Sequence, residues 1–332
     1  MQRRPIDVAT QPLITTGSFP GEDCFPLVVK AVEPRLSAAD WAINSRQFVE
    51  DNLLKFGAVL FRDYSLHRLE DFAQFAKALI GELIPYTERS SPRHQVAPNI
   101  YTSTDYPAAQ SIFLHSENSY QNTWPMRICF FCVTPAQEGG ETPIASNRKI
   151  SARIDPEIRD RFLRKKVMYV RNFGDGFGLT LEDVFQTTDR NVVEEHCRRA
   201  GIEAEWKSGH RLRTRAVRPA FETHPQTGEL IWFNHATFFN VSTLEPAVRE
   251  ALLAEFGEDD LPTNTYYGDG TPIEPSVLDQ LREIYWQEAV TFPWRKGDLL
   301  VLDNMLAAHG RVPFAGPRQI LVSMSQPWSR TS

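Results

Sequence analysis

Six short apolar segments, each bounded by turn-forming residues, constrain the fold of this 332-residue chain more than any other feature. Segments of this length and composition are typical of β-strands that are buried on one or both faces. Lys296-Gly297-Asp298, for example, marks a turn before the apolar run DLLVLD. The predicted strands are 127–134, 166–172, 229–233, 288–292, 298–303 and 319–325, with a further short buried strand at 57–61.

Between and before these strands, apolar residues recur at the spacing of amphipathic helices. The predicted helices are 37–56, 67–81, 148–165, 189–200, 245–256 and 275–288. Ser242-x-x-Glu245 and Thr271-x-x-Glu274 resemble capping boxes ahead of the last two. The pattern indicates a mainly β fold with surrounding helices, whose core is an antiparallel double-sheet barrel of the jelly-roll type.

No repeat, low-complexity tract or flexible linker divides the chain, so a single domain over residues 1–332 is expected. Residues 84–111 are rich in Pro, Ser and Thr and are predicted to form a long loop that serves as a lid. Residues 174–288 contain several of the predicted helices and are expected to form a helical insertion.

Charge and cysteine content argue against several classes of function. The net charge of -6 provides no basic field for phosphates, so nucleic acid is not an expected partner. No apolar stretch has the length of a signal peptide or a membrane span, so a cytoplasmic enzyme is expected. Cys129 and Cys132 have redox-motif spacing but lie in an apolar run, so we interpret them as buried strand residues. All four cysteines are expected to be free thiols in a reducing compartment.

His115-Ser116-Glu117 is the first candidate metal-binding segment. In a strand, residues i and i+2 point to the same face, so this imidazole and carboxylate can converge on one ion. With 42 acidic residues and eight histidines in the chain, one such pair is expected by chance, and the pair is weak by itself.

His309, between the strands predicted at 298–303 and 319–325, would complete a set of two histidines and one carboxylate. That set leaves three metal positions open and suits non-haem iron(II) oxygenases. A 2-oxo acid can occupy two of the positions and dioxygen the third, while Arg318 can form a bidentate salt bridge to the distal carboxylate of the co-substrate. Taken singly, His309 would be a core histidine and Arg318 a solvated strand end, but the joint pattern favours the metal site.

Gly139-Gly140-Glu141-Thr142-Pro143 is a third candidate segment. A glycine pair lets the backbone approach a ligand closely, and the Thr142 hydroxyl can donate to a carboxylate. The alternative for this segment is a plain turn.

Three blocks of sequence resemble the taurine dioxygenase (TauD/TfdA) family of 2-oxoglutarate-dependent oxygenases. The blocks are FLHSENSY (113–120), FFCVTPAQEGGETPIA (130–145) and GDLLVLDNMLAAHGRVPFAGPRQIL (297–321). The greatest similarity is to a branch that includes syringomycin-pathway amino-acid hydroxylase-like enzymes and, more distantly, trimethyllysine hydroxylase.

The resemblance implies a cupin-like double-stranded β-helix with His115, Glu117 and His309 as iron ligands and with Thr142 and Arg318 as 2-oxoglutarate contacts. Glu117 stands where the more common family motif has Asp, although some members use Glu. Halogenases similar to this family replace that ligand with a small residue to admit chloride, so Glu117 disfavours halogenation.

Five further residues are candidate substrate contacts because they adjoin the ligands or lie in a run similar to the amino-acid-hydroxylating branch. They are Asn118, Trp232, Asn234, His235 and Arg311.

The leading hypothesis is an iron(II)- and 2-oxoglutarate-dependent dioxygenase that hydroxylates an unactivated C–H bond of an amino acid, free or tethered to a carrier protein. It would use dioxygen, release succinate and carbon dioxide, and belong to specialised-metabolite biosynthesis. A desaturase, cyclase or epimerase would share the same residues. A metal hydrolase or isomerase would need neither Arg318 nor 2-oxoglutarate, and a non-catalytic binding protein would ordinarily have lost a ligand. The oligomeric state stays open.

Overall fold

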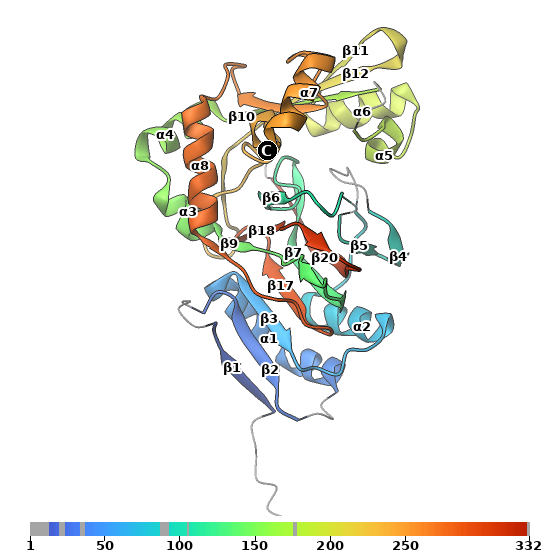
Figure 1. Cartoon of the computed structure of the whole chain (residues 1–332), viewed down its shortest axis with the longest axis vertical. Coiled ribbons are helices and arrows are strands. Elements are labelled where there is room, and N and C mark those ends of the chain that lie inside the picture. The colour runs from blue at the N-terminus through green and yellow to red at the C-terminus, as the bar shows by residue number, and fades with distance from the viewer. Residues whose placement is uncertain are drawn as a thin grey trace, which may run out of the picture.

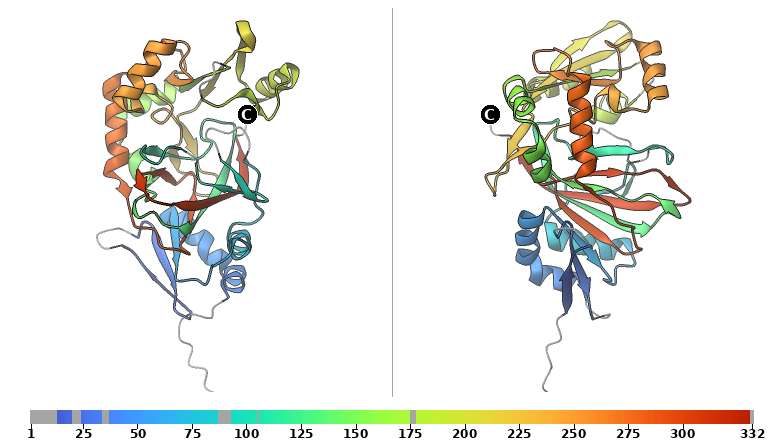
Figure 2. Two further views of the ribbon diagram at one scale, coloured as in Figure 1. Left: turned by 45° about the vertical axis from the view of Figure 1, so that its right-hand side comes forward. Right: turned by 60° about the vertical axis from the view of Figure 1, so that its left-hand side comes forward.

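The computed structural model describes residues 13–19, 24–33, 37–86, 93–104, 106–174 and 178–330. Strands form the middle of the molecule (Figure 1). Both views in Figure 2 place these strands between the N-terminal region with α1 and α2 and an outer region with α5 to α8. Among the described residues, no helix combines the length and the apolar character needed to cross a membrane.

An eight-stranded sheet forms the base of the fold, and all its described pairings are antiparallel except that of β2 with β3. In spatial order its strands are β1 (Ile14–Gly17), β2 (Leu27–Ala31), β3 (Ala58–Arg62), β17 (Leu299–Asp303), β7 (Thr123–Thr134), β20 (Gln319–Ser329), β5 (Ile100–Thr102) and β4 (Gln95–Ala97). Helices α1 (Ala38–Phe56) and α2 (Leu69–Ile80) cover one face, where Phe72 stacks on Phe131 with ring centroids 4.8 Å apart.

The opposite face of this sheet packs against a second antiparallel sheet. That sheet contains, in order, β16 (Ala289–Val290), β9 (Ile144–Ser146), β18 (Ala307–Arg311) and β6 (Ile112–His115). Side chains alternate along β7, so Phe131 faces the helices whereas Phe130 enters the core between the sheets with Ile144 and Ala307. The predicted mainly β fold with surrounding helices is confirmed.

The segment 174–288, predicted to be a helical insertion, contains strands as well as helices. Strands β11 (Glu203–Trp206), β12 (Leu212–Arg218) and β15 (Thr263–Tyr267) join β10 (Val167–Phe173) in a sheet, and β13 (Phe221–Thr223) pairs with β14 (Leu230–Trp232). The strand predicted at 229–233 corresponds to β14, whereas β11, β12, β13 and β15 were not predicted. The three arginines of β12 hid its alternation of buried and less buried side chains. The helices of this segment are α5 (Leu181–Phe185), α6 (Arg190–Ala200), η1 (Ser208–His210), η2 (Val241–Thr243), α7 (Pro246–Phe256) and α8 (Pro275–Gln287).

Five of the six predicted helices are confirmed with ends within two residues, and the sixth is divided. Residues 148–165 form α3 (Asn147–Arg153) and α4 (Pro156–Lys165), because Asp155 caps a new helix that has proline at its first position. The two capping boxes are wrong: Glu245 and Glu274 are the N-cap residues, each followed by proline and neither forming a side-chain cap bond.

The segment 84–111, predicted to be a long loop, contains the short strands β4 and β5 among its described residues. These strands extend the large sheet at β20. The long-loop prediction is therefore wrong for 95–97 and 100–102, because strands of three residues are too short to give a periodic signal. Residues 87–92 and 105 of the predicted lid lie outside the described residues. Two further short strands, β8 (Glu138–Gly139) and β19 (Phe314–Ala315), pair beside the second sheet.

Candidate metal centre

Three buried side chains meet at the second sheet: His115, Glu117 and His309. One potential ligand atom from each lies within 4.8 Å of the others. His115 ends β6 and is the register partner of His309 on β18, with ring centroids 4.6 Å apart. Glu117, however, lies in a turn beyond the end of β6, so the prediction that it shares a strand face with His115 is wrong. The turn, rather than strand alternation, brings the carboxylate to the histidines.

Asn304 fixes this turn from the connection between β17 and β18. Its side-chain oxygen accepts from the Glu117 backbone N–H at 2.8 Å, and its amide donates to the carbonyl oxygens of Glu117 and Pro125. Asn147 donates to the Ser116 hydroxyl at 2.9 Å. Sequence reasoning missed both asparagines, because each acts through contacts between segments distant in the chain.

The protonation states suit metal binding. Burial lowers the pKa of His115 and lowers that of His309 well below its usual value, so both imidazoles are neutral at neutral pH. His115 Nδ1 lies 2.8 Å from the Phe113 carbonyl oxygen, which leaves Nε2 as its available ligand atom. Glu117 Oε1 and His309 Nδ1 are buried without a hydrogen-bond partner in the described part of the chain. Such orphaned polar atoms fit a set of metal ligands.

Arg93 is a further residue of this centre that sequence reasoning missed. Its Nη2 donates to Glu117 Oε2 at 2.6 Å, and the two side chains are only 3% and 1% exposed. The ring of Tyr86 lies 4.5 Å from the guanidinium carbon. Arg93 stands in no recognisable motif, so its only signal was a basic residue in the segment that leads to His115.

Arg318 and Thr142 line the same cavity as His115 and His309. Arg318 immediately precedes β20, and its Nε and Nη1 donate to the Gly140 carbonyl oxygen at 2.8 Å and the Ser103 hydroxyl at 3.2 Å. Burial and the nearby Arg311 lower the pKa of Arg318 to about 10, which leaves it cationic at neutral pH. Thr142 Oγ1 accepts from Trp294 Nε1 at 3.1 Å, so its own hydroxyl hydrogen is available to a ligand.

Gly140, the second residue of the glycine pair 139–140, lies directly against the Arg318 side chain. Gly140 has a φ of 74°, and a Cβ there would lie 3.0 Å from Arg318 Cδ and 2.9 Å from Ala136 Cβ. Glycine is therefore required for Arg318 to lie against the backbone. The predicted close approach to the glycine backbone exists, but the approaching group is the Arg318 side chain and not a bound ligand.

The structure separates the five candidate substrate contacts into two groups. Asn118 and His235 adjoin the centre: Asn118 follows Glu117 with a buried, unpartnered Oδ1 among the described atoms, and the His235 ring lies 5.6 Å from that of His115. His235 Nδ1 also lies 2.6 Å from the Ser119 hydroxyl.

The other three candidates have structural contacts. Trp232 packs in the core, with ring centroids 5.0 Å from Phe162 and 5.1 Å from Phe221. Asn234 donates to the Ala220 carbonyl oxygen and accepts from the Ala236 backbone N–H. Arg311 lines the cavity, but its Nη1 and Nη2 donate to the backbone carbonyl oxygens of Thr104, Tyr106, Pro107 and Gln110.

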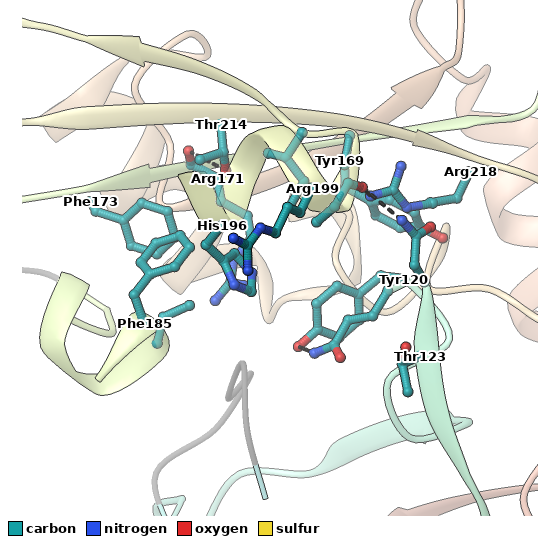
Figure 3. Close-up of a pocket in the computed structure, with 16 residues that line it drawn as sticks. Tyr120, Thr123, Tyr169, Arg171, Phe173, Phe185, His196, Arg199, Thr214 and Arg218 are labelled. Atoms are coloured by element: carbon teal, nitrogen blue, oxygen red, sulfur yellow. Dashed lines mark hydrogen bonds between the residues drawn. The ribbon is translucent and has the colours of Figure 1, made fainter. Parts of the chain in front are cut away.

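A second pocket of about 230 Å³ lies beside this centre. Figure 3 shows aromatic and basic side chains around it, among them Tyr120, Arg171, His196 and Arg199. The Tyr120 ring, which lines this pocket, lies 4.9 Å from the ring of His235, and the His235 ring lies 5.6 Å from that of His115.

The chain is similar in sequence to known proteins. The chain is 41% identical over 294 residues to the dapdiamide synthesis protein DdaC of Enterobacter agglomerans, covering 88% of this chain and 89% of the relative. It is 27% identical over 293 residues to a clavaminate synthase-like protein of Arabidopsis thaliana, covering 85% of each.

Among solved structures, PvcB of Pseudomonas aeruginosa has a similar fold, with a TM-score of 0.54, 16% identity and coverage of 90% of this chain and 84% of that one. AAD-2, solved with Mn(II) and N-oxalylglycine, also has a TM-score of 0.54, with 13% identity and coverage of 94% and 96%. The family described as "Taurine catabolism dioxygenase TauD, TfdA family" matches residues 25–324. The resemblance seen in the three sequence blocks is thereby confirmed, and the chain belongs to the TauD/TfdA dioxygenase family.

Proposed function

We propose that this protein is an iron(II)- and 2-oxoglutarate-dependent dioxygenase in which His115, Glu117 and His309 bind the metal. The observation that carries the proposal is the approach of three buried ligand atoms, two from imidazoles and one from a carboxylate, to within 4.8 Å of one another. This donor set leaves one side of the ion open and suits iron(II). Family membership supports it, as does the similar fold of two solved structures, an Fe, α-ketoglutarate dependent oxygenase and a complex with Mn(II) and N-oxalylglycine.

The fold supports the same proposal. Two antiparallel sheets face each other, with the ligands His115 and His309 on the smaller sheet. We assign this pair of sheets to the double-stranded β-helix expected from the sequence. Single-domain organisation over residues 1–332, a lid within 84–111 and a cytoplasmic location remain predictions.

Arg318 and Thr142 are the residues that we assign to 2-oxoglutarate. The Arg318 guanidinium holds the distal carboxylate of the co-substrate, and its contacts with Gly140 and Ser103 fix its direction. The Thr142 hydroxyl donates a second hydrogen bond, since Trp294 orients its oxygen. When bound, iron supplies dioxygen activation coupled to oxidative decarboxylation of 2-oxoglutarate. The chain itself supplies positioning and exclusion of water, for which Phe238, stacked on His115 with ring centroids 4.3 Å apart, forms part of the wall.

The substrate that we propose is an amino acid, free or tethered to a carrier protein, and the reaction is hydroxylation of an unactivated C–H bond. The relationship to a dapdiamide synthesis protein supports a role in specialised-metabolite biosynthesis. Asn118 and His235 are the substrate contacts that the geometry supports, because both adjoin the ligands and each has a buried polar atom without a partner among the described residues. Trp232 and Asn234 are better explained as structural residues.

The test incubates the iron-loaded protein with 2-oxoglutarate and a panel of free and carrier-bound amino acids. Mass spectrometry then measures succinate and the product. Substrate-triggered succinate with a gain of one oxygen atom in the amino acid is the expected result. A loss of two hydrogens would identify a desaturase or cyclase instead. Turnover of any substrate without 2-oxoglutarate consumption would identify a hydrolase or isomerase and overturn the proposal.

A further inference from the structure

Arg93 is a buried cation at the metal centre, and two of its donor nitrogens have no acceptor among the described residues. Its side chain is 3% exposed and lines the cavity that also contains His115 and His309. Nη2 donates to Glu117, whereas Nε and Nη1 have no hydrogen-bond partner among the described residues. Because buried N–H groups of a charged side chain are rarely left without an acceptor, these two nitrogens indicate a missing partner.

The charges around the cavity indicate that this partner is an anion. Among the described residues, the lining of the cavity includes Arg93, Arg311 and Arg318 but no aspartate or glutamate. Glu117 forms an ion pair with Arg93 at the metal centre. In the proposed function, the two positive charges of iron(II) are balanced by the two negative charges of 2-oxoglutarate. The excess of arginine charge therefore persists after metal and co-substrate have bound. A buried excess of this kind favours a ligand that carries a negative charge.

Arg93 is the arginine best placed to receive such a ligand. The Nη groups of Arg311 are occupied by four backbone carbonyl oxygens, and Arg318 is directed by Gly140 and Ser103 toward the proposed co-substrate site. Arg93, in contrast, lies directly beside the proposed ligand Glu117. Glu117 and the Tyr86 ring hold the guanidinium, while Nε and Nη1 have no acceptor in the part of the chain that the structure describes.

We propose that Arg93 binds a carboxylate of the substrate, so that the substrate is a carboxylic acid held beside the iron. This inference rests on the proposed function and narrows it. A thioester link to a carrier protein consumes the α-carboxylate of an amino acid. Arg93 therefore selects either a free amino acid through its α-carboxylate or a carrier-bound one through a side-chain carboxylate.

The test uses the full chain loaded with Mn(II) and N-oxalylglycine, an analogue of 2-oxoglutarate, and measures binding calorimetrically. The panel pairs each proteinogenic L-amino acid and its N-acetyl derivative with the corresponding α-amide, and pairs aspartate and glutamate with asparagine and glutamine. At least one acid is expected to bind the wild type about tenfold or more tightly than its amide. Arg93→Gln should weaken the acid by a similar factor and leave the amide unchanged, while Arg93→Lys should retain part of the acid's affinity.

Melting temperature and N-oxalylglycine affinity serve as controls for folding, and Arg318→Gln is the matched variant that should lose N-oxalylglycine. The proposal is overturned if no acid in the panel binds, if amides bind as tightly as acids, or if Arg93→Gln binds the acid like the wild type. Loss of Mn(II) by Arg93→Gln would also overturn it, because the residue would then serve to orient Glu117. Failure of the wild type to bind Mn(II) or N-oxalylglycine would instead count against the proposed function.

Discussion

His115 and His309 are register partners on the neighbouring antiparallel strands β6 and β18, and their ring centroids lie 4.6 Å apart. The pairing of two strands that are distant in sequence therefore creates two thirds of the candidate ligand set. Beyond His309 the register of this strand pair shifts before Arg311. Beyond this shift, Arg311 donates to the carbonyl oxygens of Thr104, Tyr106, Pro107 and Gln110.

Replacing Arg318 should weaken 2-oxoglutarate binding strongly while leaving metal binding intact. Loss of one partner from a buried charge pair costs roughly 2 to 5 kcal/mol, which corresponds to about 30-fold or more in affinity. Arg318→Gln should show the full loss, and Arg318→Lys a smaller one because the planar fork is lost but the charge stays. Calorimetric titration of the Mn(II)-loaded protein checks this. Unchanged affinity in both variants would remove Arg318 from the co-substrate site.

Arg311→Lys should destabilise the fold rather than the co-substrate complex. The side chain donates to four backbone carbonyl oxygens, and a lysine cannot reach all of them at once. We expect a loss of about 1 to 3 kcal/mol in the free energy of unfolding, measured by denaturant titration, with N-oxalylglycine affinity unchanged. A variant as stable as the wild type but unable to bind substrate would restore the substrate-contact role predicted for Arg311 from the sequence.

Thiol labelling should detect one reactive cysteine in the native protein. Cys129, Cys132 and Cys197 are buried, whereas Cys24 is partly exposed. Burial raises the pKa of Cys129 and raises that of Cys132 to about 12, so neither forms the reactive thiolate at pH 8. Denaturation should expose all four thiols of the chain. Rapid native labelling of Cys129 or Cys132 at pH 8 would contradict their place in the core and revive the redox interpretation.

Much of this fold could be predicted from the sequence because its signals are local. Apolar runs identified β7, β17 and β20, and amphipathic spacing identified α1 and α2. The errors arose where tertiary contacts override local pattern. The short strands β4 and β5, for example, form because β5 pairs with β20 and β4 pairs with β5.

The residues of the candidate site also differ in whether the local sequence identifies them. His115, Glu117 and His309 were recognisable because their types and order form a motif, and the structure brings them together. Arg93 and Asn304 had no such signal, since their roles exist only through contacts made in the folded chain. Trp232 was predicted to contact the substrate because it lies in a run of polar and aromatic residues. Its indole is instead fully buried in the core.

Hydrogen exchange should divide the predicted lid into two parts. Amides of β5 pair with β20, so they should be protected with or without ligands. The backbone amide of Arg93, by contrast, should gain protection when Mn(II), N-oxalylglycine and a bound acid are all present. Equal, strong protection of both parts in the free protein would show a fixed wall, and 174–188 would then be the next candidate for a gate.

Anaerobic iron(II) binding tests the central claim most directly. The metal-free wild type should bind one iron(II) per chain, whereas His115→Ala, Glu117→Ala and His309→Ala should each bind it about 100-fold more weakly or not at all. His67→Ala, which removes an exposed histidine, is the matched control and should bind like the wild type. Wild-type affinity in all three ligand variants would contradict the account, because the iron would then be held by residues other than His115, Glu117 and His309.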